Sequence, residues 1–152
     1  MKKPALVILN YNGVRYLEKF LPDVITFSKD DADIYVADNC STDGSIEMLS
    51  ERFPEVKVIV NEYNGGFATG YNLALKQIDA EYFILLNSDI EVTKGWIPPV
   101  INLMKSDPMI GAVQPKIRSY NRKTHFEYAG ASGGFIDRFG YPFCRGRLFL
   151  AL

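Results

Sequence analysis

Clusters of polar side chains follow directly after four apolar runs in this sequence, and they contain residue types that can bind a ligand. The clusters are Asn10-Tyr11-Asn12, Asp38-Asn39, Asn61 with Asn64-Gly65-Gly66, and Asn87-Ser88-Asp89. Amide, hydroxyl and carboxylate groups hydrogen-bond the polar atoms of small molecules, and a carboxylate such as that of Asp89 can also hold a divalent cation. Any one cluster alone is more typical of an ordinary turn, because Asn, Asp and Gly are common turn formers.

The apolar runs before these clusters predict the strands of a parallel sheet. They are residues 5–9, 34–37, 56–60 and 82–86. Strands and helical patterns alternate along the chain, which favours an α/β fold with right-handed crossovers. In such a sheet ligands bind outside the carboxyl ends of the strands, so we expect the four clusters to converge on one cleft. The run at 82–86 should be buried on both faces and should present Asp89 at the rim.

The segments between the strands predict helices. The first helical pattern, which begins near Val14, should break at Pro22 because an internal proline loses a hydrogen bond. The side chains of Ser41, Thr42 and Asp43 can all cap the second helix. The other elements expected are a helix with Tyr71, Leu75 and Ile78 on one face, a helix from Trp96 to about Met104, a fifth strand at 110–113, and an irregular hairpin region after Pro115 that ends in an apolar tail.

Composition limits the function classes. The chain has 152 residues, of which 47% are hydrophobic and 23% charged, as is ordinary for one globular domain. Its 17 basic and 18 acidic residues give a net charge of -1, so no global field attracts nucleic acid or an anionic membrane. The two cysteines, Cys40 and Cys144, lie in no metal-ligand spacing, which favours reduced thiols in a cytoplasmic protein. The apolar run at residues 5–9 is too short for a signal peptide, and no run is long enough to span a bilayer.

The order of the motifs resembles that of family 2 glycosyltransferases, and most closely the bacterial rhamnosyltransferase-like members. The matching stretches are 7–13 (VILNYNG), 36–45 (VADNCSTDGS), 61–72 (NEYNGGFATGYN) and 85–89 (LLNSD), within a likeness that runs from about residue 5 to residue 115. The resemblance implies a GT-A fold, with a mostly parallel sheet flanked by helices. It also implies inverting transfer of a sugar from a nucleotide diphosphate to an acceptor hydroxyl, in cell-surface polysaccharide synthesis.

The resemblance assigns nucleotide-binding roles to residues in all four clusters. Asp38 matches the aspartate that accepts a hydrogen bond from the nucleotide base. A carboxylate suits the imide N–H of uracil or thymine, so the expected donor is a UDP- or dTDP-sugar. The remaining nucleotide-binding residues implied are Asn10, Tyr11, Asn12, Asn64, Gly65, Gly66, Asn72, Asn87 and Ser88.

Residues 87–89 occupy the place of the family's DXD motif, in which a carboxylate holds a divalent cation, Mn²⁺ or Mg²⁺, against the diphosphate. Here the first position is Asn87, so Asp89 is the one carboxylate expected to bind the metal. An amide lowers the negative charge available to a cation. We therefore expect weak metal binding without nucleotide, with the nucleotide diphosphate supplying most of the ligands.

An inverting transferase also needs a general base, and no carboxylate after Asp89 stands in a matching context. We expect the base beyond Leu152, with residues 1–115 forming the nucleotide-sugar-binding half and 116–152 an incomplete start of the acceptor-side region. The expected acceptor is a glycan or a lipid-linked glycan, so peripheral contact with the inner face of the membrane is a further expectation. The basic residues Lys116, Arg118, Arg122 and Lys123 could bind the diphosphate or an anionic lipid acceptor, although a solvated hairpin face is the commoner meaning.

Other functions stay open at this point. The chain could be a donor-binding fragment without activity of its own, or a non-catalytic interaction domain. It could also be a nucleotidyltransferase, which shares a similar α/β fold. Against that last alternative, no Gly-rich loop with Arg and Lys follows the first strand, where a triphosphate would need to be held.

Overall fold

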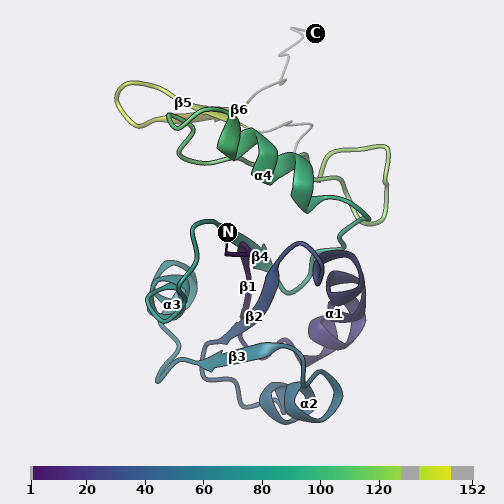
Figure 1. The fold of residues 1–152 in the computed structure, drawn as a ribbon. Helices are drawn as coiled ribbons and strands as arrows, with labels where there is room; N and C mark the ends of the chain where they lie inside the picture. Colours follow the sequence, from purple (N-terminus) through teal and green to yellow (C-terminus); the bar gives the residue numbers. More distant parts are fainter. Residues whose placement is uncertain (1, 128–133, 145–152) are drawn as a thin grey trace, which may run out of the picture. The chain divides into compact units, whose positions relative to one another are not determined.

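Four parallel strands form the sheet in the first part of the chain. The computed structural model describes residues 2–127 and 134–144, and the chain divides into two units, Met1–Ile101 and Asn102–Leu152. In the first unit, β1 (Ala5–Asn10), β2 (Asp33–Asp38), β3 (Lys57–Val60) and β4 (Phe83–Asn87) lie in the order β3-β2-β1-β4 (Figure 1). The carboxyl ends of these strands are nearly level, because Asn10 pairs with Asp38 and Leu9 with Asn87. The four predicted strands and their parallel order are confirmed.

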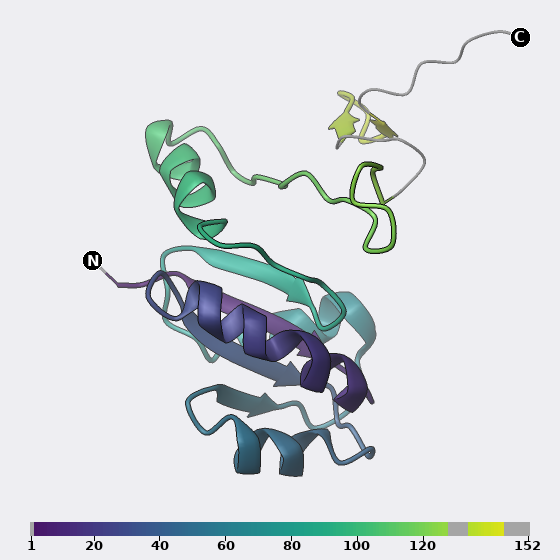
Figure 2. The same cartoon turned by 90° about the vertical axis from the view of Figure 1, so that its right-hand side faces the viewer.

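Helices cover both faces of this sheet. α1 (Val14–Ser28) and α2 (Ser45–Arg52) pack on one face, and α3 (Gly66–Leu75) packs on the other, as Figures 1 and 2 show. The helix predicted from Trp96 to about Met104 is present as α4 (Ile97–Ser106), which has Pro98 and Pro99 in its first turn. None of the described helices is both long enough and apolar enough to cross a membrane.

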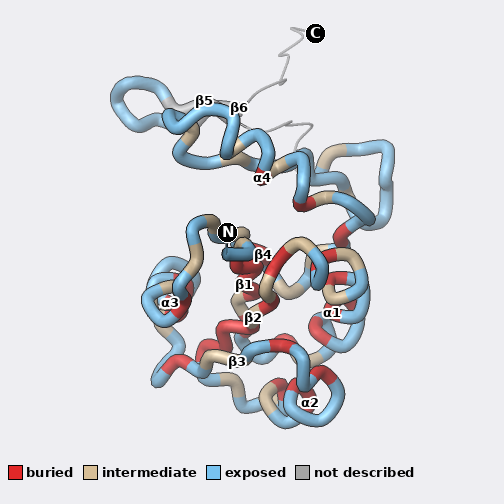
Figure 3. Tube along the Cα trace, in the orientation of Figure 1, coloured by how far each residue is buried: buried red, intermediate tan, exposed pale blue. Residues whose placement is uncertain are grey.

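The core lies in two layers on either side of β1 and β2. Alternate side chains of β1 enter opposite layers: Leu6 and Ile8 pack with α1 and α2, whereas Ala5 and Val7 pack against α3. This alternation follows from the two-residue period of a strand. Figure 3 shows buried residues gathered along β1 and β2, which makes these two strands the rigid centre of the first unit.

The prediction that the 82–86 strand is buried on both faces is wrong. Leu86 is buried, but Phe83 and Leu85 are 40% and 50% exposed. β4 is an edge strand of the described sheet, and the apolar residues of α3 pack over β1 and β2 instead. A continuous apolar run therefore did not distinguish an edge strand from a central one.

Pro22 does not break the first helix, contrary to prediction. α1 runs through it from Val14 to Ser28. Pro22 is exposed, so the carbonyl that it leaves without an intrahelical donor is on the solvent side, where water can bond it. Buried side chains before and after the proline, Leu17 and Val24 among them, hold both halves of the helix on the sheet.

The second unit confirms one prediction and contradicts another. β5 (Gly134–Ile136) and β6 (Pro142–Cys144) form an antiparallel pair, as expected of a hairpin region. Residues 110–113 form no strand, and they pair with no other strand in the described part of the chain. A four-residue apolar run needs a neighbour to hydrogen-bond before it becomes a strand. The apolar tail expected at 148–152 lies outside the described residues, and the division at residue 115 stays a prediction.

Candidate functional site

A cleft of about 430 Å³ opens at the carboxyl ends of the four strands, entirely within the first unit. The residues that line it come from the ends of all four strands and the segments after them, and they include four asparagine amides, one serine hydroxyl and one carboxylate from the predicted clusters. The full lining is Leu9, Tyr11, Asn12, Gly13, Tyr16, Asn39, Asn64, Gly66, Phe67, Asn87, Ser88 and Asp89. The structure thus brings together parts of every cluster that the sequence singled out.

The position of the cleft follows from the strand order. β1 lies between β2 and β4, and the helices that follow β1 and β3 cover opposite faces of the sheet. This is a topological switch point, because the strand order runs outward from β1 to β3 and then returns to place β4 on the other side of β1. The loop after β1 and the loop after β4 both line the cleft at this point.

Four of the predicted binding residues do not line the cleft. Asn10 and Asp38 are buried beneath it, with 1% and 0% of their surfaces exposed. Gly65 is the N-cap residue of α3, next to the lining residues Asn64 and Gly66. Asn72 is exposed on α3, away from the cleft lining.

The buried pair joins the loop after β1 to the loop after β2. Asn10 Nδ2 donates to Asp38 Oδ2 at 2.8 Å, and the backbone N–H of Ser41 donates to Asp38 Oδ1 at 2.7 Å. Ser41 Oγ accepts from Asn10 Nδ2 and from the backbone N–H of Asn12, and Asn12 Oδ1 accepts from the N–H of Thr42. These hydrogen bonds hold Asn12, a lining residue with a positive φ of 49°, in a fixed backbone conformation.

Asp43 links the amino ends of two helices in the same region. Its Oδ2 accepts from the N–H of Val14, the first residue of α1, and its Oδ1 accepts from the N–H and the hydroxyl of Ser45, the first residue of α2. Of the three predicted capping residues, Asp43 is the one that makes these bonds, although Gly44 is the N-cap residue itself. Partial burial raises the pKa of Asp43, but the hydrogen bonds from Ser45 and Val14 outweigh it and lower the pKa overall.

A second network joins the loop after β2 to the start of α3. Asn39 donates to the carbonyl of Gly66 at 2.9 Å and to Asn64 Oδ1 at 3.3 Å, and it accepts from Asn61 Nδ2 at 2.7 Å. Asn64 Oδ1 also accepts from the N–H of Gly66. Asn39 and Asn61 belong to the clusters noticed in the sequence, but the resemblance assigned neither a binding role, and only the fold shows that both are buried.

Aromatic side chains form much of the apolar wall of the cleft. Tyr11, Tyr16 and Phe67 line it and are more than half exposed, at 53%, 52% and 62%. Tyr16 and Phe67 were not predicted; the sequence signal for them is an aromatic residue in the first turn of the helix after the first and after the third polar cluster. Half-exposed aromatic rings beside amides suit a ligand that has both a flat face and hydrogen-bonding edges.

Tyr71 connects α3 to the end of β4 beneath this wall. Its hydroxyl donates to the carbonyl of Leu86 at 2.9 Å, and burial raises the pKa of Tyr71 to about 12. The ring of Phe67 packs edge-on against that of Tyr71, with centroids 5.0 Å apart. Tyr71 therefore fixes the helix that presents Phe67 next to the strand that presents Asn87.

The electrostatics of the cleft rest on Asp89, the one charged residue among the described residues that line it. Asn87, Ser88 and Asp89 offer an amide, a hydroxyl and a carboxylate oxygen, the hard donors that Mg²⁺ and Mn²⁺ accept. In the described part of the chain, no group of three His, Cys, Asp or Glu side chains could hold a metal. The donor set thus fits a cation that shares its coordination with a ligand's phosphates, and does not fit a cage built by the protein alone.

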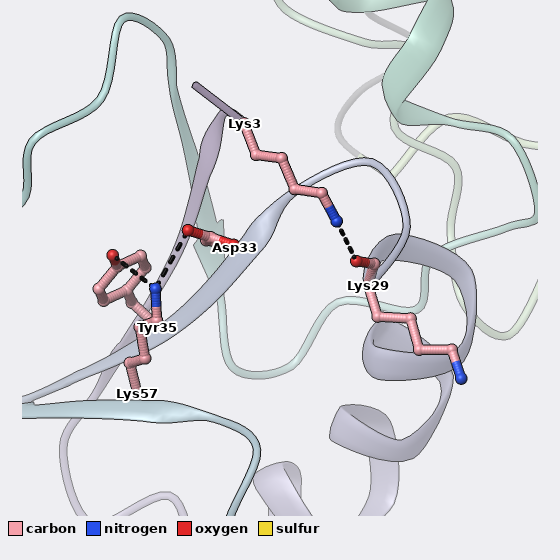
Figure 4. A network of polar contacts seen from close by, with 5 residues as sticks. All are labelled: Lys3, Lys29, Asp33, Tyr35 and Lys57. Atoms are coloured by element: carbon pink, nitrogen blue, oxygen red, sulfur yellow. Dashed lines mark hydrogen bonds and ion pairs between the residues drawn. The ribbon is translucent and has the colours of Figure 1, made fainter. Parts of the chain in front are cut away.

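A second cavity, of about 370 Å³, is lined by residues that include Lys29, Asp33 and Lys57. Lys57 donates to Asp33 at 3.1 Å and to the Tyr35 hydroxyl at 3.3 Å, while Lys3 donates to the carbonyl of Lys29 (Figure 4). The bond to Asp33 is the main cause of a raised pKa of Lys57. The side chains of Lys57 and Asp33 are about half exposed, so solvent screens the pair, and no predicted site residue lies here.

Known proteins resemble this chain in sequence over most of its length. The model of the family described as Glycosyl transferase family 2 matches residues 5–148. An N-acetylglucosaminyl-diphospho-decaprenol L-rhamnosyltransferase of Mycobacterium tuberculosis is 27% identical over 124 residues, which cover 74% of this chain and 40% of the relative. TuaG of Bacillus subtilis, a putative teichuronic acid biosynthesis glycosyltransferase, is 32% identical over 107 residues, covering 67% of this chain and 42% of the relative. The chain thus spans about two fifths of the length of these relatives.

Solved structures share the fold. Staphylococcus aureus TarS 1-349 in complex with UDP-GlcNAc superposes with a TM-score of 0.59 at 22% identity, covering 77% of this chain and 38% of that one. The mannosyltransferase PcManGT from Pyrobaculum calidifontis, in complex with GDP-Man and Mn²⁺, gives 0.59 at 17% identity, covering 76% and 33%. The GT-A fold expected from the sequence is confirmed.

Proposed function

Since the chain belongs to glycosyl transferase family 2, we propose that its cleft binds a nucleotide-diphospho-sugar for transfer of the sugar, with inversion, to an acceptor hydroxyl. The observation that carries this proposal is the convergence of residues from all four strand ends on one cleft at the switch point of the sheet. The cleft combines a wall of exposed aromatic rings, a row of amides and one carboxylate. These groups suit a nucleoside at one side and a metal-bound diphosphate at the other.

The nucleoside would bind against the loops after β1, β2 and β3. Tyr11 supplies an apolar face, and Asn12, Asn64 and Gly66 supply hydrogen-bonding groups that line the cleft. Asp38 acts through the groups it holds, because its carboxylate is fully buried and accepts bonds from Asn10 and Ser41. The preference for UDP or dTDP over GDP stays a prediction, as do contributions from Gly65 and Asn72.

The diphosphate would bind near residues 87–89. Asp89 would hold the divalent cation, Mn²⁺ or Mg²⁺, with Asn87 and Ser88 bonding the ligand or the waters of the metal. When bound, such a cation supplies positive charge that stabilises the diphosphate leaving group. No Lys or Arg lines the cleft in the part of the chain that the structure describes, so Asp89 alone would repel a diphosphate. Nucleotide binding should therefore depend strongly on the cation.

The acceptor is proposed to be a glycan or a lipid-linked glycan. One relative is named for a diphospho-decaprenol substrate and another for teichuronic acid biosynthesis, which supports this choice. The general base of the inverting reaction stays unassigned. A cytoplasmic location with peripheral contact at the inner face of the membrane stays a prediction, which fractionation of cells that express the protein would test.

Nucleotide titration tests the proposal directly. UDP, dTDP and GDP are titrated into the folded protein by calorimetry, each with and without MnCl₂. We expect binding of at least one pyrimidine diphosphate that strengthens by 10-fold or more with Mn²⁺. A sample with a cooperative unfolding transition that binds none of the three nucleotides would refute the proposed function.

A further inference from the structure

Asn39 differs from the other polar residues that line the cleft because it is buried, with 2% of its surface exposed. The remaining polar lining residues are half-buried or exposed. A buried amide at the base of a binding cleft has to satisfy its hydrogen-bonding groups within the protein. Its partners therefore show what it does.

The orientation of the Asn39 amide is fixed by those partners. Asn61 Nδ2 donates to Asn39 Oδ1, and it also donates to the carbonyl of Gly70 at 3.1 Å. With its oxygen held on that side, the Asn39 NH₂ group points toward the carbonyl of Gly66 and toward Asn64 Oδ1. A flipped amide would set its oxygen against these two acceptors and its NH₂ group against that of Asn61, so only one orientation fits.

The segment that Asn39 holds is the part of α3 that lines the cleft. Gly66 has a positive φ of 71°, and its N–H and its carbonyl are bonded to Asn64 and Asn39, respectively. No N-cap side chain and no acidic residue of the first turn helps to hold the backbone at this end of the helix. The backbone at 64–67 thus depends on Asn39 for its position.

Gly70 lies directly against the side-chain amide of Asn39. A Cβ atom at position 70 would lie 2.5 Å from both Nδ2 and Oδ1 of Asn39, closer than any real contact allows. Since three hydrogen-bonding partners pin the amide, it cannot move aside without losing bonds. Glycine at position 70 is what lets the amide reach between the ends of β2, β3 and α3.

We propose that Asn39 is a positioning residue that sets the nucleotide affinity of the cleft by holding the 64–67 segment in its binding conformation. This inference rests on the proposed nucleotide binding. Asn39 acts by ordering Asn64, Gly66 and Phe67 in advance of the ligand, so that binding does not have to order them. Gly70 serves the same end by leaving room for the amide.

Two single variants and their combination test this role. In Asn39→Ser the new side chain is uncharged, like asparagine, but too short to reach Gly66. UDP affinity with Mn²⁺ present should therefore fall at least 10-fold. Gly70→Ala should displace the Asn39 amide and weaken UDP binding to a similar extent. In the double variant the shorter serine leaves space for the alanine methyl, so its affinity should equal that of Asn39→Ser alone.

Ala74→Gly is the matched control. Ala74 is buried in the same helix and outside the network, so glycine there lowers the melting temperature of the protein but should leave UDP affinity unchanged. NMR adds a structural readout: the amide signals of Gly66 and Phe67 should shift in Asn39→Ser without nucleotide and stay in place in Ala74→Gly.

The outcomes separate this inference from the proposed function. If the unaltered protein binds UDP and Asn39→Ser binds it equally well, Asn39 is not a positioning residue. Losses that simply add in the double variant also overturn the inference, because Gly70 then acts independently of Asn39. If the folded, unaltered protein binds no nucleotide, the proposed function fails and this inference fails with it.

Discussion

Loss of the Asp43 carboxylate should destabilise the protein by an amount that depends on pH. Asp43 accepts hydrogen bonds at the amino ends of both α1 and α2, from Val14 and from Ser45. Removing a side-chain cap costs about 0.5 to 2 kcal/mol for each helix. Asp43→Ala, which removes both, should therefore lower the free energy of unfolding at pH 7 by about 1 to 4 kcal/mol. Asp43→Asn keeps one acceptor oxygen, so its free energy of unfolding should lie between that of Asp43→Ala and that of the parent protein.

The pH dependence has a defined sign. The pKa of Asp43 is lower in the folded chain than its ordinary value of 3.8, so the ionised carboxylate stabilises the fold above that value. This contribution is lost as the pH falls through the folded-state pKa. The difference in free energy of unfolding between the parent and Asp43→Asn should be largest and constant from pH 5 to 7, and it should shrink below pH 4.

Urea denaturation followed by circular dichroism at several pH values measures these differences. Asp79→Asn is a suitable control, because Asp79 pairs with Lys2 on the surface with 86% of its side chain exposed. Such a pair contributes little, so this variant should match the parent within about 0.5 kcal/mol. An Asp43→Ala variant as stable as the parent at pH 7, or a gap that does not change with pH, would refute the capping role.

Three further changes have defined outcomes. Asp89→Asn should abolish the Mn²⁺-dependent gain in UDP affinity measured by calorimetry, and a gain that persists would contradict the metal role of Asp89. Tyr71→Phe removes the hydroxyl that donates to the carbonyl of Leu86 and should cost about 1 to 3 kcal/mol in urea unfolding. In the parent protein, the absorbance of ionised Tyr71 should appear only near pH 12. Cys40 has a positive φ of 64°, so Cys40→Gly should relieve strain and raise stability by about 0.5 kcal/mol after the added entropy of the unfolded chain is deducted. A lower stability would show that the side chain of Cys40 contributes more than its strain costs.

The sequence predicted the strands, and it predicted that the cleft lies at the carboxyl ends of the strands. Both depend on local features: each apolar run ends in polar residues, and parallel strands place those ends at one edge. The structure differs from the prediction where burial or strand formation depends on a neighbouring segment that is distant in the sequence. Leu85 is exposed because no strand or helix within the first unit covers it. Residues 110–113 form no strand because no other described segment pairs with them.

The same limit applies within the site. Asp38 and Asn39 are neighbours in the sequence, yet Asp38 is buried beneath the cleft and Asn39 lines it, because consecutive side chains at a strand end point in different directions. No sequence pattern shows which of two adjacent polar residues faces the ligand. Pro22 was misjudged for a similar reason, since its effect depends on whether the carbonyl that it leaves unpaired faces water.

The side-chain hydrogen bonds around the cleft join three of its four loops and leave out the fourth. Side-chain bonds tie together the loops after β1, β2 and β3, but among the described residues none ties Asn87, Ser88 or Asp89 to those loops. Substitutions in the loops after β1, β2 and β3 therefore affect both folding and binding. The side chains of Asn87, Ser88 and Asp89 can change with little cost to the stability of the fold. Selection for a new cation or sugar donor could act on residues 87–89 while the nucleoside-binding loops stay the same.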